Sequence, residues 1–240
     1  TAFGQQSLQA NTTGSNNTAI GTYSLYNNTT NNNSAFGYKA LFANTTGAFN
    51  VAVGYISLQS NTRGSYNTAV GYNSLSANTF GNYNSAFGYK ALNSNTTGNR
   101  NSAFGYSSLR LNTIGVRNTA FGYASMLFNT TGSYNVAFGT MALYINGIGT
   151  ANTAVGFESL YNNTTSNNSA FGYRALKANT IGTYNVAVGV DTLYNNTIGT
   201  NNNAVGVNAL FANTTGANNV AIGTSALSSN TIGIENSSLG

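Results

Sequence analysis

Large apolar side chains recur along this chain at a fixed interval, and small or polar residues fill the positions between them. A representative stretch runs from Asn67 to Gly81 and reads NTAVGYNSLSANTFG, and near copies begin at Asn84, Asn101 and Asn118. Successive copies are 17 residues apart, apart from two steps of 16. A fixed period of this length is typical of proteins built from stacked repeats. Positions are counted below from the alanine of the Ala-x-Gly core, which is position 1.

Each repeat carries two apolar segments separated by turn residues. Position 2 is always large and apolar, position 3 is always Gly, and position 7 is Leu in every full copy except one, where Met126 replaces it. Positions 10 and 16 are Asn throughout. This punctuation predicts two short strands per repeat, one centred on the alanine and one on the Ala/Ser-Leu pair. Two glycines and several Asn and Thr residues in each repeat disfavour a helix.

One such strand pair cannot bury its apolar face alone, but stacked copies can, because each coil hydrogen-bonds to the next. We therefore expect an all-β fold, a parallel β-solenoid or β-roll of about fifteen 17-residue coils. The repeats run from end to end, so residues 1–240 are predicted to form a single repeat domain. The chain opens and closes within a repeat, and we expect it to be a fragment of a longer fibre protein.

Strand alternation sets which side chains point into the coil. We expect position 2 to face position 7 in a thin core ladder that includes Phe87, Leu92, Phe104, Leu109, Phe121 and Met126. The Asn positions are expected to stack as amide ladders that include Asn78, Asn84, Asn95, Asn101, Asn112 and Asn118. Alanine and glycine would then form a flat outer strip, a candidate subunit interface at Ala69, Gly71, Ala86, Gly88, Ala103 and Gly105. The opposite facing, with alanine inside and position 2 in the interface, leads to the same oligomer.

The run Asn-Thr-Ala-Val-Gly-Tyr-x-Ser/Ala-Leu, as in Asn67 to Leu75, resembles the repeats of trimeric autotransporter adhesin heads. It is also similar to repeats in bacteriophage tail-fibre and related trimeric fibre proteins. The resemblance covers essentially the whole chain and implies parallel β-rolls, with three chains packed about a common axis as an attachment fibre. This chain departs from those repeats in its longer coil, which has an extra Asn-Thr-Thr-Gly turn. No binding residue carries over.

Composition gives little support to catalysis. The chain has no His and no Cys, and its only acids are Glu158, Asp191 and Glu235. Glu158 and Asp191 share a repeat position that elsewhere holds bases, and we interpret them as solvated surface acids. We therefore expect no enzyme activity, no cofactor and no metal. The net charge of +5 comes from scattered bases, which argues against nucleic-acid binding. No apolar run approaches the roughly 20 residues that a membrane span needs, so we expect no membrane insertion in this segment.

Exposed aromatic and basic side chains suggest one candidate ligand surface, which comprises Tyr66, Tyr83, Arg100, Arg117 and Tyr134. The function expected from the repeats is a non-enzymatic structural shaft of a homotrimeric fibre or adhesin. Such a shaft would be extracellular, on a virion or a bacterial cell surface, with a cell-surface glycan or other receptor as a further partner. Two alternatives remain open. Threonine at position 11 suggests an ice-binding solenoid, and aromatic side chains beside Asn suit a glycan-binding repeat lectin.

Overall fold

The computed structural model describes residues 1–240 and contains strands and turns but no helix. It divides into two compact units, residues 1–118 and 119–240. The first unit contains β1 (Ala2–Phe3), β2 (Thr18–Ile20), β3 (Ser34–Phe36), β4 (Val51–Val53), β5 (Thr68–Val70), β6 (Ser85–Phe87) and β7 (Ser102–Phe104). The second contains β8 (Thr119–Phe121), β9 (Val136–Phe138), β10 (Thr153–Val155), β11 (Ser169–Phe171), β12 (Val186–Val188), β13 (Asn203–Val205), β14 (Val220–Ile222) and β15 (Ser237–Leu239).

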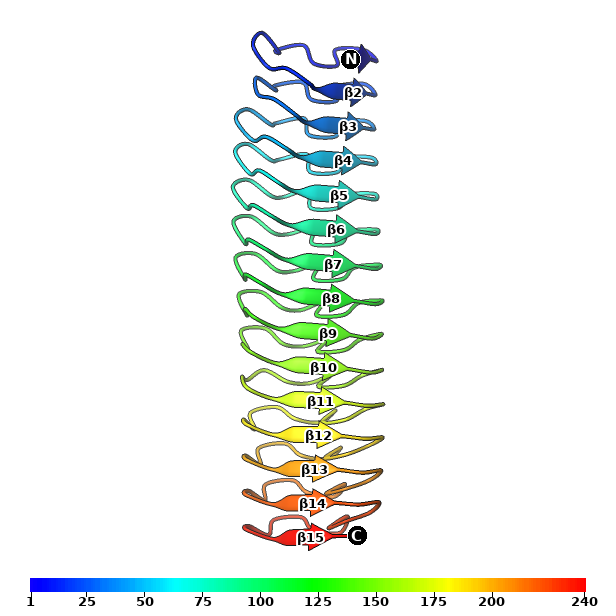
Figure 1. The fold of residues 1–240 in the computed structure, drawn as a ribbon, viewed down its shortest axis with the longest axis vertical. Helices are drawn as coiled ribbons and strands as arrows, with labels where there is room; N and C mark the ends of the chain where they lie inside the picture. The colour runs from blue at the N-terminus through cyan, green and yellow to red at the C-terminus, as the bar shows by residue number, and fades with distance from the viewer. The chain divides into compact units, whose positions relative to one another are not determined.

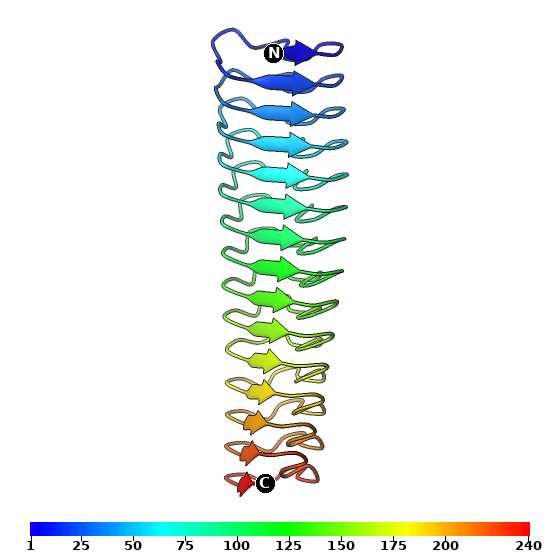
Figure 2. The same cartoon turned by 45° about the vertical axis from the view of Figure 1, so that its right-hand side comes forward.

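Within each unit, successive strands pair in parallel and in sequence order (Figure 1). The register places each repeat position beside its equivalent in the next coil, as in the pair Ala86 and Ala103. The turned view in Figure 2 shows each strand on one side of its coil, with the chain looping back behind it. The prediction of an all-β parallel β-solenoid with 17-residue coils is therefore confirmed. That residues 1–240 form one repeat domain remains a prediction. The absence of helices also means that none is long and apolar enough to cross a membrane.

The interior of each coil is narrow and holds alanine rather than phenylalanine. The position-1 alanines from Ala19 to Ala221 are fully buried, and so are the position-7 side chains from Leu25 to Leu210, including Leu92, Leu109 and Met126. Phe121 is 37% exposed, and Phe87 and Phe104 are only partly buried. The expected core ladder is therefore right for its leucine and methionine members and wrong for its three phenylalanines.

The size of the side chains explains this inversion. The largest fully buried side chains are Leu and Met, and buried Ser and Asn occupy much of the remaining interior. A strand must direct alternate side chains to opposite faces. With Leu and Asn already inside, only the small alanine fits beside them, and position 2 points outward.

The leucine segment is not a second strand, contrary to the sequence prediction. Residues at positions 5 and 7 adopt a left-handed backbone conformation, for example Lys90 with φ of 53° and Leu92 with φ of 51°. This conformation is costly for residues other than Gly, Asn and Asp. Two contributions offset the cost at Leu92: its side chain is fully buried, and its backbone N–H donates to the Ser108 carbonyl oxygen of the next coil at 3.0 Å. The chain therefore turns tightly while still bonding to its neighbour.

The position-3 glycines let the coils approach each other closely. Gly88 has φ of 134°, and a Cβ atom there would lie 2.5 Å from the Gly105 carbonyl oxygen. The predicted interface strip of Ala69, Gly71, Ala86, Gly88, Ala103 and Gly105 is therefore wrong. Its alanines are fully buried in their own coils, and the close contact between successive coils is enough to require glycine there.

The two asparagine columns hold successive coils together, as predicted. At position 10, Asn78 donates from Nδ2 to Asn61 Oδ1 at 2.8 Å and to the Gly81 carbonyl oxygen at 3.0 Å. At position 16, Asn84 donates from Nδ2 to the Gly98 carbonyl oxygen at 2.9 Å. The predicted members Asn78, Asn84, Asn95, Asn101, Asn112 and Asn118 are all fully buried. Each amide thus gives a hydrogen-bond partner to backbone groups of a buried turn that water does not reach.

Removing one column residue should destabilise the protein far more than removing its exposed neighbour. Asn202 Nδ2 donates to the Gly216 carbonyl oxygen at 2.8 Å, and its Oδ1 accepts from the Asn219 backbone N–H at 3.1 Å. Asn202→Ala leaves the Asn219 N–H buried and unpaired. It also removes one of the two hydrogen bonds to the Gly216 carbonyl oxygen, which Asn213 Nδ2 also reaches at 3.1 Å. It should lower the free energy of unfolding by about 3 kcal/mol. Asn201→Ala, at an exposed turn position with φ of 56°, should cost only about 1 kcal/mol from backbone strain. Urea unfolding followed by circular dichroism measures both, and equal effects would contradict the ladder.

A matched pair of glycine substitutions tests the close approach of coils. Gly88→Ala places a methyl group against the backbone of the next coil, which cannot move aside, and should cost more than about 3 kcal/mol. Gly147→Ala is the control: Gly147 also has positive φ, 57°, but nothing lies within 4 Å of its added Cβ. Its expected cost is about 1–2 kcal/mol from backbone strain alone. A thermal-unfolding comparison in which both variants lose the same stability would refute the packing argument.

Candidate functional site

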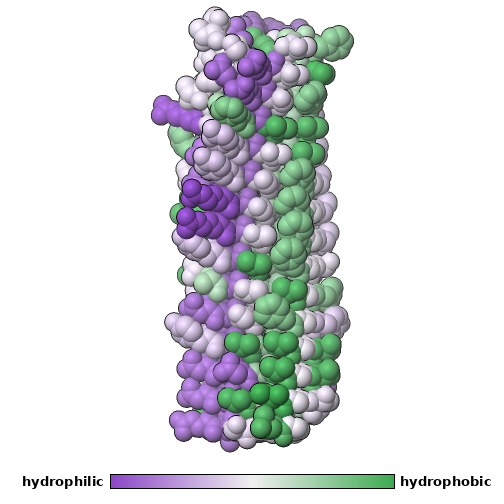
Figure 3. Space-filling view, in the orientation of Figure 1, coloured by the Kyte–Doolittle hydropathy of each residue, from purple (hydrophilic) through white to green (hydrophobic).

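The most distinctive surface of each unit is the side of the strands that faces away from the coil interior. We call it the outer sheet face and define it by the residue before the buried alanine and the apolar residue at position 2. Val51 and Val53 are 37% and 36% exposed on either side of the buried Ala52. Figure 3 shows hydrophobic side chains gathered in a column over the strands, beside hydrophilic turns.

Aromatic rings extend this face and stack from coil to coil. In the first unit, Phe87 and Phe104 stack with ring centroids 4.8 Å apart. Beside them, position 4 forms a tyrosine ladder whose successive centroids lie 4.9–5.3 Å apart, and it consists of Tyr38, Tyr55, Tyr72, Tyr89 and Tyr106. In the second unit, Phe121 and Phe138 stack at 4.8 Å. Contiguous exposed apolar side chains of this kind mark interaction surfaces more often than open solvent-facing surface.

The predicted ligand surface is only partly suited to stacking a sugar ring. Tyr66 and Tyr83 stack on each other at 5.0 Å with an interplanar angle of 3°, and the Arg100 guanidinium lies 5.6 Å from the centre of the Tyr83 ring. The faces of Tyr83 that a sugar would need are therefore covered by Tyr66 and Arg100. Arg117 follows Arg100 at the same repeat position within the first unit, and Tyr134 belongs to the second unit.

The two acids that sequence analysis left in solvent are in fact paired with bases. Asp191 accepts two hydrogen bonds from Arg174, both at 2.8 Å, and Glu158 Oε2 lies 2.7 Å from Lys177 Nζ. These contacts raise the pKa of Arg174 and of Lys177 above their ordinary values, chiefly through the hydrogen bond to the carboxylate. The sequence did contain a signal for these pairs, because in successive coils residues of opposite charge occupy repeat positions that stacking brings together. Both acids are thereby committed to structural ion pairs.

Threonine side chains at position 11 also have internal partners. The Thr62 hydroxyl donates to the Thr79 carbonyl oxygen at 3.1 Å, and the Thr79 hydroxyl donates to the Thr96 carbonyl oxygen at 3.1 Å. The hydroxyl protons of this column are therefore used to join coils. An ice-binding array needs such groups to face water, so the geometry of this column favours a structural role.

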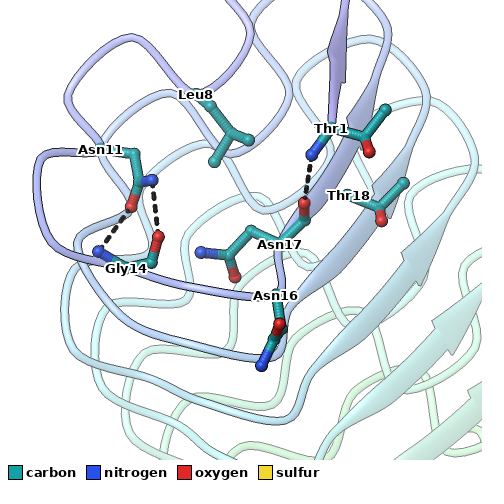
Figure 4. Close-up of a pocket in the computed structure, with 7 residues that line it drawn as sticks. All are labelled: Thr1, Leu8, Asn11, Gly14, Asn16, Asn17 and Thr18. Atoms are coloured by element: carbon teal, nitrogen blue, oxygen red, sulfur yellow. Dashed lines mark hydrogen bonds between the residues drawn. The ribbon is translucent and has the colours of Figure 1, made fainter.

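A polar pocket of about 400 Å³ lies at the first coil and is lined by residues that include Leu8, Asn11 and Asn17 (Figure 4). Asn11 Nδ2 donates to the Gly14 carbonyl oxygen at 2.9 Å, and the Gly14 backbone N–H donates back to Asn11 Oδ1 at 3.1 Å. The lining therefore consists of the same leucine and asparagine columns that stack in the following coils. It contains no group of three or more acidic, His or Cys side chains suited to a metal.

Comparison with family models, with curated proteins and with solved structures finds no match to this chain. The outer sheet face and the repeat itself are therefore the features of this chain that bear on its function.

Aromatic stacking in the position-15 column should be measurable as stability. Tyr66 and Arg100 cover the two ring faces of Tyr83. Tyr184 occupies the same repeat position with nearly the same backbone, φ of 57° compared with 58° for Tyr83. It has no aromatic residue at that position in either adjacent coil. Tyr83→Ala should therefore lower the free energy of unfolding by about 0.5–1.5 kcal/mol more than Tyr184→Ala. Urea unfolding of the two variants gives the difference. Equal losses would mean that the rings contribute only through their burial.

Proposed function

We propose that this protein is a non-enzymatic structural shaft in which three parallel chains pack through their outer sheet faces. The supporting observation is the column of exposed Phe, Val and Ile at position 2, flanked in the first unit by the tyrosine ladder. An apolar column this regular is expected to lose its contact with water in the working assembly. Parallel chains would place equivalent coils side by side, so one set of contacts would repeat along the shaft.

The mechanism proposed is mechanical. Each coil is joined to the next by backbone hydrogen bonds, amide ladders and stacked rings, which resist bending and local unfolding. A rigid shaft can hold a receptor-binding region away from the surface that carries it. We therefore place the protein outside the cell, in a virion fibre or on a bacterial surface, where attachment is the function. Adhesion to a cell-surface glycan or another receptor is part of this proposal.

Mass measurement in solution tests the oligomer directly. The chain mass is 24.9 kDa, and light scattering coupled to size-exclusion chromatography should return three times this value. Lysine at two outer-face positions, Val188→Lys with Val205→Lys, should dissociate the trimer because it places charges in an apolar contact. The control is Ile181→Lys with Ile198→Lys, which changes exposed apolar residues on the turns instead and should leave the trimer intact.

Circular dichroism must show that both double variants keep the fold. A monomeric wild-type protein would contradict the trimer. Dissociation by both pairs of substitutions, with the fold intact, would place the contact elsewhere. A thermal-hysteresis assay on the same samples separates the shaft from an ice-binding solenoid, because only the latter would shape ice crystals. A glycan array tests the lectin alternative.

A further inference from the structure

Charge is distributed very unevenly between the two units. The first unit contains six bases and no acid; the bases are Lys39, Arg63, Lys90, Arg100, Arg110 and Arg117. The second contains two bases and all three acids of the chain, Glu158, Asp191 and Glu235. Both bases of the second unit are paired with carboxylates. No carboxylate side chain in the first unit can pair with its bases, which makes that unit attractive to anions from solution.

The ion pair between Glu158 and Lys177 in the second unit shows which repeat positions can bring charges together. Glu158 is at position 5 of its coil, and Lys177 is at position 8 of the following coil. Their charged atoms lie 2.7 Å apart. Side chains at these two positions can therefore reach a common point on the surface between adjacent coils.

Lys90 and Arg110 occupy the same two positions in the first unit. Lys90 is at position 5 of the coil that begins with β6, and Arg110 is at position 8 of the coil that begins with β7. The backbone agrees in two respects at both places, although the coil that carries Glu158 is one residue shorter than the coil that carries Lys90. Lys90 and Glu158 each have φ of 53°. The backbone hydrogen bond between the two coils also has the same length at both places. The Ser107 N–H donates to the Tyr89 carbonyl oxygen at 2.9 Å, and the Arg174 N–H donates to the Phe157 carbonyl oxygen at 2.9 Å.

The two bases therefore stand where the second unit has a base and an acid. The Lys90 ammonium lies 5.1 Å from the centre of the Tyr89 ring. Arg110 Nε is buried and has no hydrogen-bond partner. A buried donor without an acceptor is rare in folded proteins and costs free energy. Once the Arg110 side chain turns to expose Nε, an acceptor from solution would satisfy this donor, and an anion would also offset the positive charge of the two bases.

We propose that Lys90 and Arg110 form a binding site for an anionic group, a sulfate, phosphate or carboxylate. The guanidinium fork of Arg110 matches two oxygens of such a group, and the Lys90 ammonium adds a third contact as a point charge. The anion takes the place that the Glu158 carboxylate has beside Lys177. The group arrives either as a free inorganic ion or as part of an acidic polysaccharide that lies beside Tyr89 and Tyr106.

Calorimetric titration of the intact protein tests the site, with sodium sulfate in one arm and a sulfated polysaccharide in the other, at constant ionic strength. One sulfate should bind per chain. Lys90→Gln and Arg110→Gln should each weaken binding by roughly tenfold to a hundredfold, because each removes a charged hydrogen bond. Arg63→Gln is the control: it removes the same charge at position 12 of another coil and should change affinity by less than about twofold.

Two charge-changing variants make the test sharper. Lys90→Glu should abolish sulfate binding, because it recreates beside Arg110 the ion pair seen between Glu158 and Lys177. Glu158→Lys should create a second site beside Lys177 and raise the stoichiometry from one sulfate to two. Circular dichroism checks that each variant is folded.

Binding of inorganic sulfate alone would assign the site to a free anion, and much tighter binding of the polymer, lost with the same variants, would assign it to an acidic polysaccharide. The proposal would be overturned if neither sodium sulfate nor the sulfated polysaccharide bound. It would also be overturned if Lys90→Gln, Arg110→Gln and Arg63→Gln lowered the affinity equally. None of these results depends on whether the chain is a trimer.

Discussion

The asparagine ladders are the constraint on which the rest of this structure depends. Most amides at positions 10 and 16 satisfy the carbonyl oxygen of a buried turn and also bond to the equivalent amide of the coil before, as Asn95 does with Gly98 and Asn78. One side chain therefore fixes both the shape of a turn and the register between coils. Because Nδ2 donates two hydrogen bonds while Oδ1 accepts, Ser, which has one donor, and Asp, which has none when ionised, would each leave a group unpaired.

Once the ladders are in place, the interior has room for little else. Leucine fills one side of the coil and alanine the other, and the glycine at position 3 lets neighbouring backbones touch. The large apolar residues are displaced to the outside, where they stack with their equivalents at nearly the spacing of the strands themselves. The apolar outer face is thus a direct consequence of the polar interior, and the proposed assembly through this face follows from the same packing.

Much of this architecture could be predicted from the sequence. The period, the parallel stacking, the buried leucines and the asparagine columns all follow from residues that recur in every copy or all but one, such as Asn84 and Asn101. The orientation of the strand could not be predicted, because Ala86 and Phe87 are both apolar and alternation alone allows either to face inward. Volume decides between them, and the free volume depends on where the asparagines lie. The leucine segment was mistaken for a strand because Leu92 gives no sign in its residue type that it adopts positive φ.

The candidate sites show the same division. Of the residues predicted to form a ligand surface, Tyr66, Tyr83 and Arg100 do lie together, but the stacking that covers the faces of Tyr83 emerges only from the side-chain geometry. The ion pair between Glu158 and Lys177 lay hidden in the sequence because its members come from different repeat positions. Such contacts can be recognised once the structure shows that position 5 of one coil lies near position 8 of the next. The comparison of Lys90 and Arg110 with that pair depends on the same relation.

Hydrogen exchange of the asparagine side-chain amides, resolved by nuclear magnetic resonance, tests the central role of the ladders most directly. From Asn28 to Asn219 each amide of the two columns is fully buried and hydrogen-bonded, so its protons should exchange orders of magnitude more slowly than those of an exposed turn amide such as Asn218. The account predicts two well-separated classes, with the column amides protected as strongly as the strand backbone. Uniformly fast exchange of all asparagine side chains would contradict it.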